Sequence, residues 1–205
     1  MNAIPDSNPA VRLVSRADFP SRYGDFEIFG FEHLPTGEPF VVLVRGPLDG
    51  EAVPLLRIHS QCLTGDALGS RRCDCGYQLQ TALRLIQESG CGLLIYQLQE
   101  GRGIGILNKL MSYQLQDEGA DTVEANQMLG FEADLREYAA CGEILHRLGV
   151  NRVRLLSNNP SKIRSLEAAG IRVMERVPLE MPSDERSNQY LKTKKDKLGH
   201  LLDQV

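Results

Sequence analysis

The sequence lacks several features that would place the chain in a membrane, outside the cell or on nucleic acid. No apolar run approaches the ~20 residues needed to cross a bilayer, and residues 1–20 lack the basic start and apolar core of a secretory signal. The formal net charge is −4, whereas a general nucleic-acid binder presents a basic surface. We therefore expect a cytoplasmic protein with neither nucleic-acid nor membrane partners.

Cysteine is scarce, and its count is odd: five in 205 residues. An odd number does not suit a disulfide framework, and thiols stay reduced in the cytosol. Three of the five nevertheless fall in one polar segment, CLTGDALGSRRCDCG, residues 62–76. Clustered thiols in such a segment are not typical of a hydrophobic core, so we expect them to carry chemistry.

The chain also lacks repeats, low-complexity tracts and an obvious linker, and its length suits one domain. Residues 1–20 are expected to be a flexible lead-in to a single domain over 21–205. Apolar periodicity predicts strands near 25–33, 39–46, 53–60, 91–99, 151–157 and 171–177, and helices near 76–90, 105–119, 134–149, 159–170 and in part of 186–205. The first strands are expected to be antiparallel, and the later alternation of helices and strands indicates α/β packing. The predicted fold class is therefore mixed α/β, a single compact domain with a mixed sheet flanked by helices.

The spacing Cys62-x10-Cys73-x-Cys75 lacks the paired knuckles that supply four ligands in a closed structural zinc site. Three protein ligands with one open position are typical of a catalytic zinc, whose bound water can ionise near neutral pH. Two alternatives remain: a structural zinc with a distant fourth ligand, and free thiols. Cys91 and Cys141 are expected to be small buried core residues.

Three further segments offer weaker signals, each with an ordinary structural explanation. EGRGIG (100–105) opens a helix and exposes backbone amides beside Arg102, yet it matches neither common phosphate-binding glycine pattern. In SNNPSK (157–162), Asn159 and Pro160 fit a helix start, and only Lys162 hints at an anion there. Asp134 with Glu137 resembles a capping box.

Tyr113 lies on roughly the opposite side of its predicted helix from an apolar stripe formed by Leu107, Leu110, Met111 and Leu115. The pattern leaves two possibilities open. The ring either faces solvent or points into a cleft.

Taken together, the order and the residues of these segments resemble those of GTP cyclohydrolase II, the enzyme family that catalyses the first step of riboflavin biosynthesis. The resemblance rests on RIHSQCLTGDALGSRRCDCG, QEGRGIGILNK, DTVEAN, LGFEADLR and NNPSK, and it extends over roughly residues 22–200. It implies a zinc-dependent hydrolase that converts GTP to formate, pyrophosphate and a diaminopyrimidinone ribosylamine 5′-phosphate. It further implies one Zn²⁺ per subunit, Mg²⁺ with the triphosphate, and a homodimer.

The same resemblance implies roles for residues of this chain. The zinc ligands would be Cys62, Cys73 and Cys75. The catalytic residues would be Asp134 as proton acceptor, Arg136 as nucleophile, and Tyr113. The GTP-binding residues would be Arg57, Ile58, His59, Ser60, Gln61, Gln78, Glu100, Gly101, Arg102, Thr122, Ser157 and Lys162.

Two positions differ from the usual family pattern, because Gln61 replaces a Glu and Ser157 replaces a Thr. Both changes keep hydrogen-bonding ability, and the first removes a negative charge beside the metal. Two alternatives to the full reaction are a paralogue that stops at the formylated pyrimidine or serves another pathway, and a non-catalytic, zinc-stapled nucleotide-binding module.

Overall fold

The structure is a computed structural model that describes residues 10–180 and 188–203. The described strands are β1 Val11–Ser21, β2 Gly24–His33, β3 Glu38–Arg45, β4 Leu55–Ser60, β5 Gly92–Gln97, β6 Arg152–Leu156 and β7 Arg172–Val177. The described α-helices are α1 Leu63–Asp66, α2 Cys75–Ser89, α3 Gly105–Asp117, α4 Thr122–Met128, α5 Ala139–Arg147, α6 Pro160–Ala168 and α7 Asn188–Leu198, and a 3₁₀ turn, η1, covers Glu100–Gly103.

The strands of the described residues form one mixed sheet in the order β1-β2-β3-β5-β4-β6-β7. Pairing is antiparallel from β1 through β3 to β5, and parallel from β5 through β4 and β6 to β7. The predicted mixed α/β class is therefore confirmed. Antiparallel neighbours need only tight turns, whereas the parallel half needs helical crossovers, and this explains why helices concentrate in the second part of the chain.

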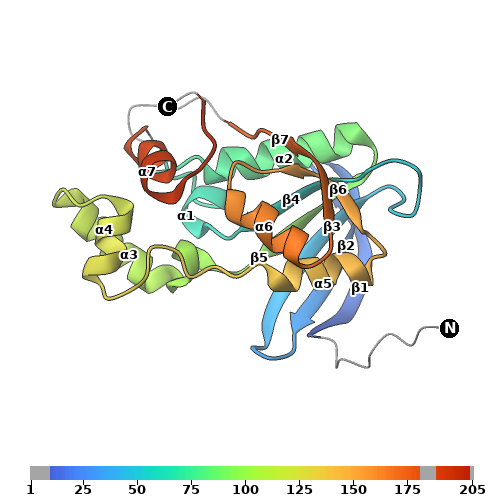
Figure 1. Cartoon of the computed structure of the whole chain (residues 1–205), viewed down its shortest axis with the longest axis horizontal. Coiled ribbons are helices and arrows are strands. Elements are labelled where there is room, and N and C mark those ends of the chain that lie inside the picture. Colours follow the sequence, from blue (N-terminus) through green and yellow to red (C-terminus); the bar gives the residue numbers. More distant parts are fainter. Residues whose placement is uncertain (1–9, 181–187, 204–205) are drawn as a thin grey trace.

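Helices cover both faces of the sheet (Figure 1). On one face, α5 and α6 bury Ile144, Leu145 and Leu166 against Phe31 and other apolar residues of the strands. On the other face, α2 buries Ala82, Leu83 and Ile86. The remaining helices, α1, α3, α4 and α7, lie together at one side of the molecule (Figure 1). These helices therefore do not pack on the sheet as α2, α5 and α6 do, and they can form a binding site.

The expected lead-in over residues 1–20 is wrong for its second half. Val11–Ser21 forms β1, which pairs antiparallel with β2 at the edge of the sheet. Only Val11 of this strand is buried, so the strand carries no inward alternation that a sequence pattern could detect. Residues 1–9 lie outside the described residues.

The helix expected over 134–149 begins later, at Ala139. Asp134 does not form the capping box suggested by Glu137, because its carboxylate accepts hydrogen bonds from Arg136 instead. A complete capping box occurs at α4, where Asp121 and Glu124 bond each other's backbone N–H groups. Within the part of the chain that is described, no helix is both long and apolar enough to cross a membrane.

Candidate active site

The site lies where the parallel strands end. β4 ends at Ser60 and leads to Cys62, β5 ends at Gln97 and leads to Glu100, and β6 ends at Leu156 and leads to Ser157. Ligands in open α/β sheets bind outside the carboxyl ends of the strands. Three segments far apart in sequence are brought together here for that reason.

Cys62, Cys73 and Cys75 converge at this edge. Cys62 precedes α1, and Cys75 is the first residue of α2. The three sulfur atoms lie within 4.8 Å of one another, and the Sγ atoms of Cys62 and Cys73 are 3.6 Å apart. All five cysteines of the chain are free thiols.

The donor set fits zinc. Tetrahedral coordination with Zn–S bonds of about 2.3 Å places sulfur atoms about 3.8 Å apart, close to the separation observed. Among the described residues, this is the only group of His, Cys, Asp or Glu ligand atoms close enough to share an ion, so they supply three ligands of these types and not four. Hydrogen bonds with Cys73 and Cys75, together with nearby Lys109, hold the pKa of Cys62 well below its usual range, whereas the hydrogen bonds to Cys62 raise the pKa of Cys73 and of Cys75. A bound cation would favour the thiolate form at all three.

Gly65 is packed directly against the sulfur atoms. A Cβ at this position would lie 3.0 Å from Cys73 Sγ and 3.1 Å from Cys62 Sγ. We expect Gly65→Ala to spread the thiols and lower zinc affinity roughly 10-fold, comparable to the loss of a residue that orients a ligand, as measured by metal analysis after dialysis against a zinc buffer. Gly30→Ala is the control, since nothing lies within 4 Å of a Cβ there. Equal zinc retention by the two variants would contradict the expected crowding.

Asp66 fixes the loop that carries Cys62. Its carboxylate accepts hydrogen bonds from the Cys62 backbone N–H at 3.0 Å, the Tyr96 hydroxyl at 2.8 Å and His59 Nε2 at 3.0 Å. His59 is buried, and burial lowers its pKa. The neutral ring therefore orients Asp66 through Nε2–H, and His59 is absent from the thiol group.

Lys109 was missed by the sequence analysis, although it closes the quoted segment QEGRGIGILNK. Its ammonium group donates to Glu100 Oε1 at 2.6 Å and to Thr64 Oγ1 at 3.1 Å, and it lies 3.2 Å from Cys62 Sγ. Glu100 also accepts from the backbone N–H groups of Leu63 and Gly101. Most of the acceptor capacity of this carboxylate is therefore used within the protein.

The glycine-rich turn η1 has an unusual backbone. Arg102 has φ 61°, between Gly101 at 63° and Gly103 at 93°. A non-glycine residue whose backbone lies in the left-handed region costs free energy. Such a residue persists where the surroundings enforce it, often at functional sites. Here the Arg102 guanidinium donates to the Thr122 hydroxyl at 2.8 Å, and the Leu135 N–H donates to the Arg102 carbonyl at 3.0 Å.

Tyr113 points into the cleft, which settles the choice left open by the sequence. Its hydroxyl lies 2.9 Å from Thr64 Oγ1, and Arg72 lies over its ring. Burial raises its pKa. The apolar stripe on the opposite side of α3 faces outward instead: Leu107 is 74% exposed and Met111 is 53% exposed.

The cleft consists of two adjoining pockets, each of about 640 Å³ including its opening to solvent. We call the first the thiol pocket, because the three cysteines line it together with Glu100, Lys109 and Tyr113. We call the second the cationic pocket, because its lining includes Arg57, Arg102, Arg136, Lys162 and Lys194. Both pockets are lined by Ser60, Cys75, Arg102, Arg136 and Tyr190, so they form one continuous cleft.

Lys162 is buried in the cationic pocket. It is the third residue of α6 and donates to the Ile58 carbonyl at 2.8 Å. Among the described residues, no carboxylate lies within ion-pair distance of it. Burial, with Arg57 and Arg136 nearby, holds its pKa well below the usual range. Such a group is costly unless an anion compensates it.

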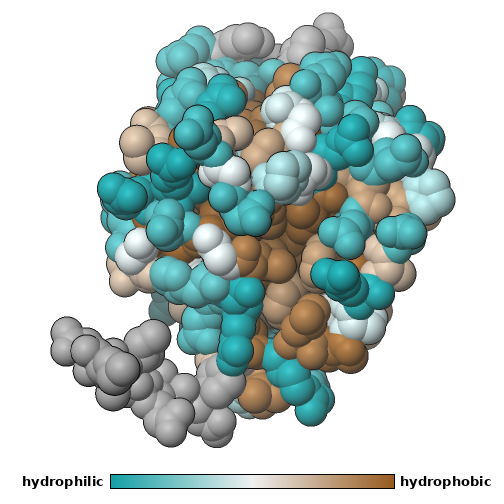
Figure 2. All heavy atoms as spheres, turned by 90° about the vertical axis from the view of Figure 1, so that its right-hand side faces the viewer, coloured by the Kyte–Doolittle hydropathy of each residue, from teal (hydrophilic) through white to brown (hydrophobic). Residues whose placement is uncertain are grey.

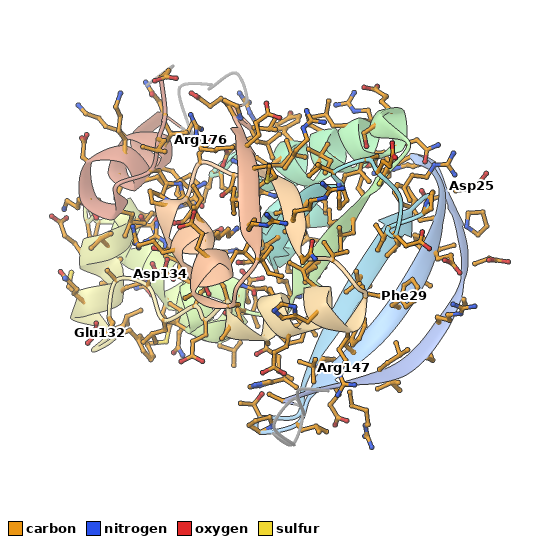
Figure 3. The ribbon with its side chains drawn as sticks, turned by 45° about the vertical axis from the view of Figure 1, so that its right-hand side comes forward. Asp25, Phe29, Glu132, Asp134, Arg147 and Arg176 are labelled. Carbon is orange, nitrogen blue, oxygen red and sulfur yellow. The ribbon has the colours of Figure 1, made fainter. Side chains whose placement is uncertain are left out.

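Arg136 and Asp134 form a bidentate ion pair with distances of 2.8 Å and 2.6 Å. Burial alone would lower the pKa of Arg136, but Tyr138 and Asp134 raise it above its usual value. Burial opposes ionisation of Asp134, yet Arg136 lowers its pKa overall. Figure 3 shows Asp134 well away from Asp25 and Phe29 of β2.

Most residues implied by the resemblance line one pocket or the other. In the thiol pocket they are Ser60, Gln61, Cys62, Cys73, Cys75, Glu100, Gly101, Arg102, Tyr113, Thr122 and Arg136. In the cationic pocket they are Arg57, His59, Ser60, Cys75, Gln78, Arg102, Arg136, Ser157 and Lys162. Asp134 reaches the cleft through Arg136. Ile58 does not reach it, because side chains alternate along β4 and this one is fully buried in the core.

Comparison with known proteins identifies the family. A sequence model described as GTP cyclohydrolase II matches residues 12–178. The chain belongs to the GTP cyclohydrolase II family. It is 53% identical over 192 residues to GTP cyclohydrolase-2 of Escherichia coli O9:H4 (strain HS), covering 94% of this chain and 98% of that protein.

Other similarities are of partial extent. The chain is also 53% identical to riboflavin biosynthesis protein VVA0006 of Vibrio vulnificus (strain YJ016), over 94% of its own length and 53% of that protein; it thus spans about half of that relative. A crystal structure of RibBX, a two-domain 3,4-dihydroxy-2-butanone 4-phosphate synthase from A. baumannii, aligns with TM-score 0.46 at 18% identity, covering 87% of this chain and 42% of that one. Membership of the cyclohydrolase family rests on the sequence model and on the E. coli relative. The RibBX structure contributes nothing to it.

Proposed function

We propose that this chain hydrolyses GTP to formate, pyrophosphate and 2,5-diamino-6-ribosylamino-4(3H)-pyrimidinone 5′-phosphate, in riboflavin biosynthesis. The observation that carries the proposal is the junction of the two pockets. A three-thiol group suited to a metal ion opens directly into a pocket lined by basic side chains. Metal-assisted hydrolysis of a purine nucleotide would use this combination, with the ring beside the metal and the phosphates among the basic side chains.

The residue roles follow the same division. The metal would be held by Cys62, Cys73 and Cys75. Catalytic roles would belong to Tyr113, Asp134 and Arg136, and Mg²⁺ would accompany the triphosphate. GTP would be bound by Arg57, His59, Ser60, Gln61, Gln78, Glu100, Gly101, Arg102, Thr122, Ser157 and Lys162, with the backbone of Ile58 alone contributing at its position.

Three hydrolytic steps account for the products. Water adds to guanine C8 and the C8–N9 bond breaks, which leaves a formamide; a second water cleaves the formamide to release formate. A third water cleaves the α–β phosphoanhydride to release pyrophosphate. Zinc, when bound, would act as a Lewis acid that lowers the pKa of water in its open position.

Glu100 suits a supporting role more than full recognition of guanine. Its carboxylate already accepts from Leu63 N–H, Gly101 N–H and Lys109. One acceptor position on Oε2 remains for a guanine N–H. The rest of the base would be read by neighbouring groups of the thiol pocket.

Arg136 is better suited to hold phosphate than to attack it. A guanidinium whose pKa lies above its usual range is protonated and has no lone pair to offer. Its planar fork matches phosphate geometry, and Asp134 fixes its orientation. We therefore assign Arg136 as a phosphate clamp and Asp134 as the residue that positions it.

Incubation of the zinc-loaded protein with GTP and Mg²⁺, followed by separate assays of formate and pyrophosphate, tests the proposal. Release of both products from each GTP is expected. Pyrophosphate without formate would instead identify an enzyme that stops at the formylated pyrimidine. Release of neither product, with GTP still bound, would identify a nucleotide-binding module.

Tyr113 is expected to matter more for formate release than for pyrophosphate release. Its hydroxyl bonds Thr64 beside Cys62, so Tyr113→Phe removes a hydrogen-bonding group near the reacting ring and leaves the ring packing intact. We expect formate release to fall roughly 100-fold, the scale of lost proton-transfer assistance, with a formylated pyrimidine accumulating in chromatograms. Tyr77→Phe, at a 63% exposed residue of α2, is the control. An unchanged formate-to-pyrophosphate ratio in Tyr113→Phe would contradict this role.

We also propose that the protein is a homodimer in the cytoplasm, where its five free thiols stay reduced. Figure 2 views the side of the molecule that carries the first strands and shows apolar side chains gathered there. Leu13 and Val14 of the edge strand β1 are 48% and 63% exposed. An exposed apolar edge strand is suited to pairing with another chain.

We expect Val14→Lys to raise the dimer dissociation constant roughly 10-fold or more, the scale of a central interface residue, as measured by light scattering at several protein concentrations. Met174→Lys, at a 57% exposed position on the opposite edge strand β7, is the matched control. A monomeric wild-type protein, or equal effects of the two substitutions, would contradict a β1 interface.

A further inference from the structure

Helix α7 and the turn that follows it form one wall of the cationic pocket. Tyr190, Lys194, Leu198, His200 and Leu202 all line this pocket. The match to the family model ends at residue 178, before this segment begins. No residue of α7 was predicted from the sequence to have a role.

This wall is attached to the rest of the site. The Leu201 N–H donates to the Asn158 carbonyl at 2.9 Å, which joins the turn to the segment after β6. The Lys197 ammonium pairs with Asp121 and Glu124 at the start of α4. The segment therefore has a defined position relative to both the phosphate-binding candidates and the thiols.

The charge in the pocket is only partly balanced by carboxylates. Lys194, with a side chain 12% exposed, pairs with Asp74 at 3.0 Å, and Arg136 pairs with Asp134. Arg57 and Lys162 are both buried, and no carboxylate of the described residues pairs with either. A bound anion of several charges would supply the missing compensation.

His200 faces the same unbalanced charge. Burial, together with the cations Lys194, Arg136, Lys162 and Arg102, lowers its pKa to about 3. The imidazole is consequently neutral at neutral pH, and one ring nitrogen carries a proton that it can donate. A neutral donor beside several cations adds a hydrogen bond for an anion without adding to their mutual repulsion.

The position along the cleft indicates which part of the substrate these residues meet. Tyr190 lines both pockets, and its hydroxyl lies 3.9 Å from Cys75 Sγ. Lys194 and His200 line only the cationic pocket. With the purine beside the thiols, the groups farther along this wall would meet the end of the triphosphate.

We propose that Lys194 and His200 bind the two outer phosphates of the substrate, so that α7 belongs to the binding site as the wall that holds the pyrophosphate unit. This inference rests on the proposed function for the identity of the substrate. It adds two binding residues and a specificity for the triphosphate over the monophosphate.

Titration calorimetry of the zinc-loaded protein with inorganic pyrophosphate, and separately with guanosine, tests the proposal. Lys194→Gln and His200→Gln are expected to weaken pyrophosphate binding roughly 10- to 100-fold, the scale of a lost charge-assisted or buried hydrogen bond, and to leave guanosine binding unchanged. Lys192→Gln is the matched control, because it removes the same charge from an exposed position of the same helix and should leave both affinities unchanged.

A purely structural role for Lys194 would give a different pattern. If Lys194 only attached α7 through Asp74, then Asp74→Asn would weaken pyrophosphate binding as much as Lys194→Gln does. On our proposal, Asp74→Asn removes a competing carboxylate and keeps or tightens pyrophosphate binding. Thermal unfolding and zinc content of each variant identify any loss that arises from misfolding.

The outcomes separate this inference from the proposed function. Unchanged pyrophosphate binding in both Lys194→Gln and His200→Gln, or equal losses in Lys194→Gln and Asp74→Asn, overturns the inference even if the wild-type protein converts GTP. If the wild-type protein binds pyrophosphate through these residues but releases no formate from GTP, the proposed function fails and the outer-phosphate site stands.

Discussion

Cys73→Ser is expected to abolish formate release, with a fall of roughly 1,000-fold or more, because a metal ion supplies several kcal/mol of transition-state stabilisation. Cys73 Sγ lies 3.6 Å from Cys62 Sγ within the three-thiol group. A serine hydroxyl is a poor substitute for a thiolate as a zinc ligand, so two sulfur donors would remain. Zinc content measured by mass spectrometry should fall together with formate release.

The matched control is Cys91→Ser. Cys91 is also a buried thiol, but it immediately precedes β5, whose other end leads to the site, and it donates to the Pro47 carbonyl at 3.2 Å, a bond that serine retains. We expect zinc content and both products to stay at wild-type levels in this variant. A Cys73→Ser protein that kept its zinc and released formate would contradict the catalytic-metal assignment.

Arg136→Ala is expected to lower pyrophosphate release roughly 1,000-fold, the scale measured when an arginine that stabilises transferring phosphate is removed. The variant also leaves Asp134 without its bidentate partner, so a negative charge would then oppose phosphate binding. Arg136→Lys keeps the positive charge but loses the fork, and we expect an intermediate rate. Quenched-flow measurement of pyrophosphate gives the rates directly.

Arg154→Ala is the control for Arg136, because Arg154 also pairs with a carboxylate, Glu175, but the two side chains are 42% and 53% exposed on β6 and β7. Its removal should leave pyrophosphate release unchanged. The clamp would be refuted by a phosphoguanosine adduct trapped on wild-type Arg136 and identified by peptide mass spectrometry. Arg136→Lys would then be as inactive as Arg136→Ala.

The order of strands and helices was largely predictable, because core elements carry clear apolar periods. Ala82, Leu83 and Ile86 of α2 recur at helical spacing and all lie in the core. Elements without such a period were missed. Strand β1 has one buried residue, and α1 has four residues, too few for a helical pattern to register.

The apolar residues of α3 also recur at helical spacing, but they face outward and not into the core. Leu107 and Met111 are exposed, whereas Ser112, on the other side, is 3% exposed. A periodic pattern shows that a helix has an apolar side but not which partner covers it. Here the polar side meets the cleft, because the residues that line it must hydrogen-bond one another and a ligand.

By itself, the sequence predicted a metal site at three cysteines, because Cys73 and Cys75 are two residues apart and one short loop connects them to Cys62. It left free thiols open, and the structure brings the three sulfur atoms within 4.8 Å of one another. The sequence also determined the family, through short segments that each match the family's sequence motifs. Only the tertiary structure decided which distant side chains join the thiols. Tyr190 lies beside Cys75 across 115 residues of sequence, and Lys194 pairs with Asp74 across 120. Such contacts depend on strand order and on where α7 packs, which no local pattern of residues encodes.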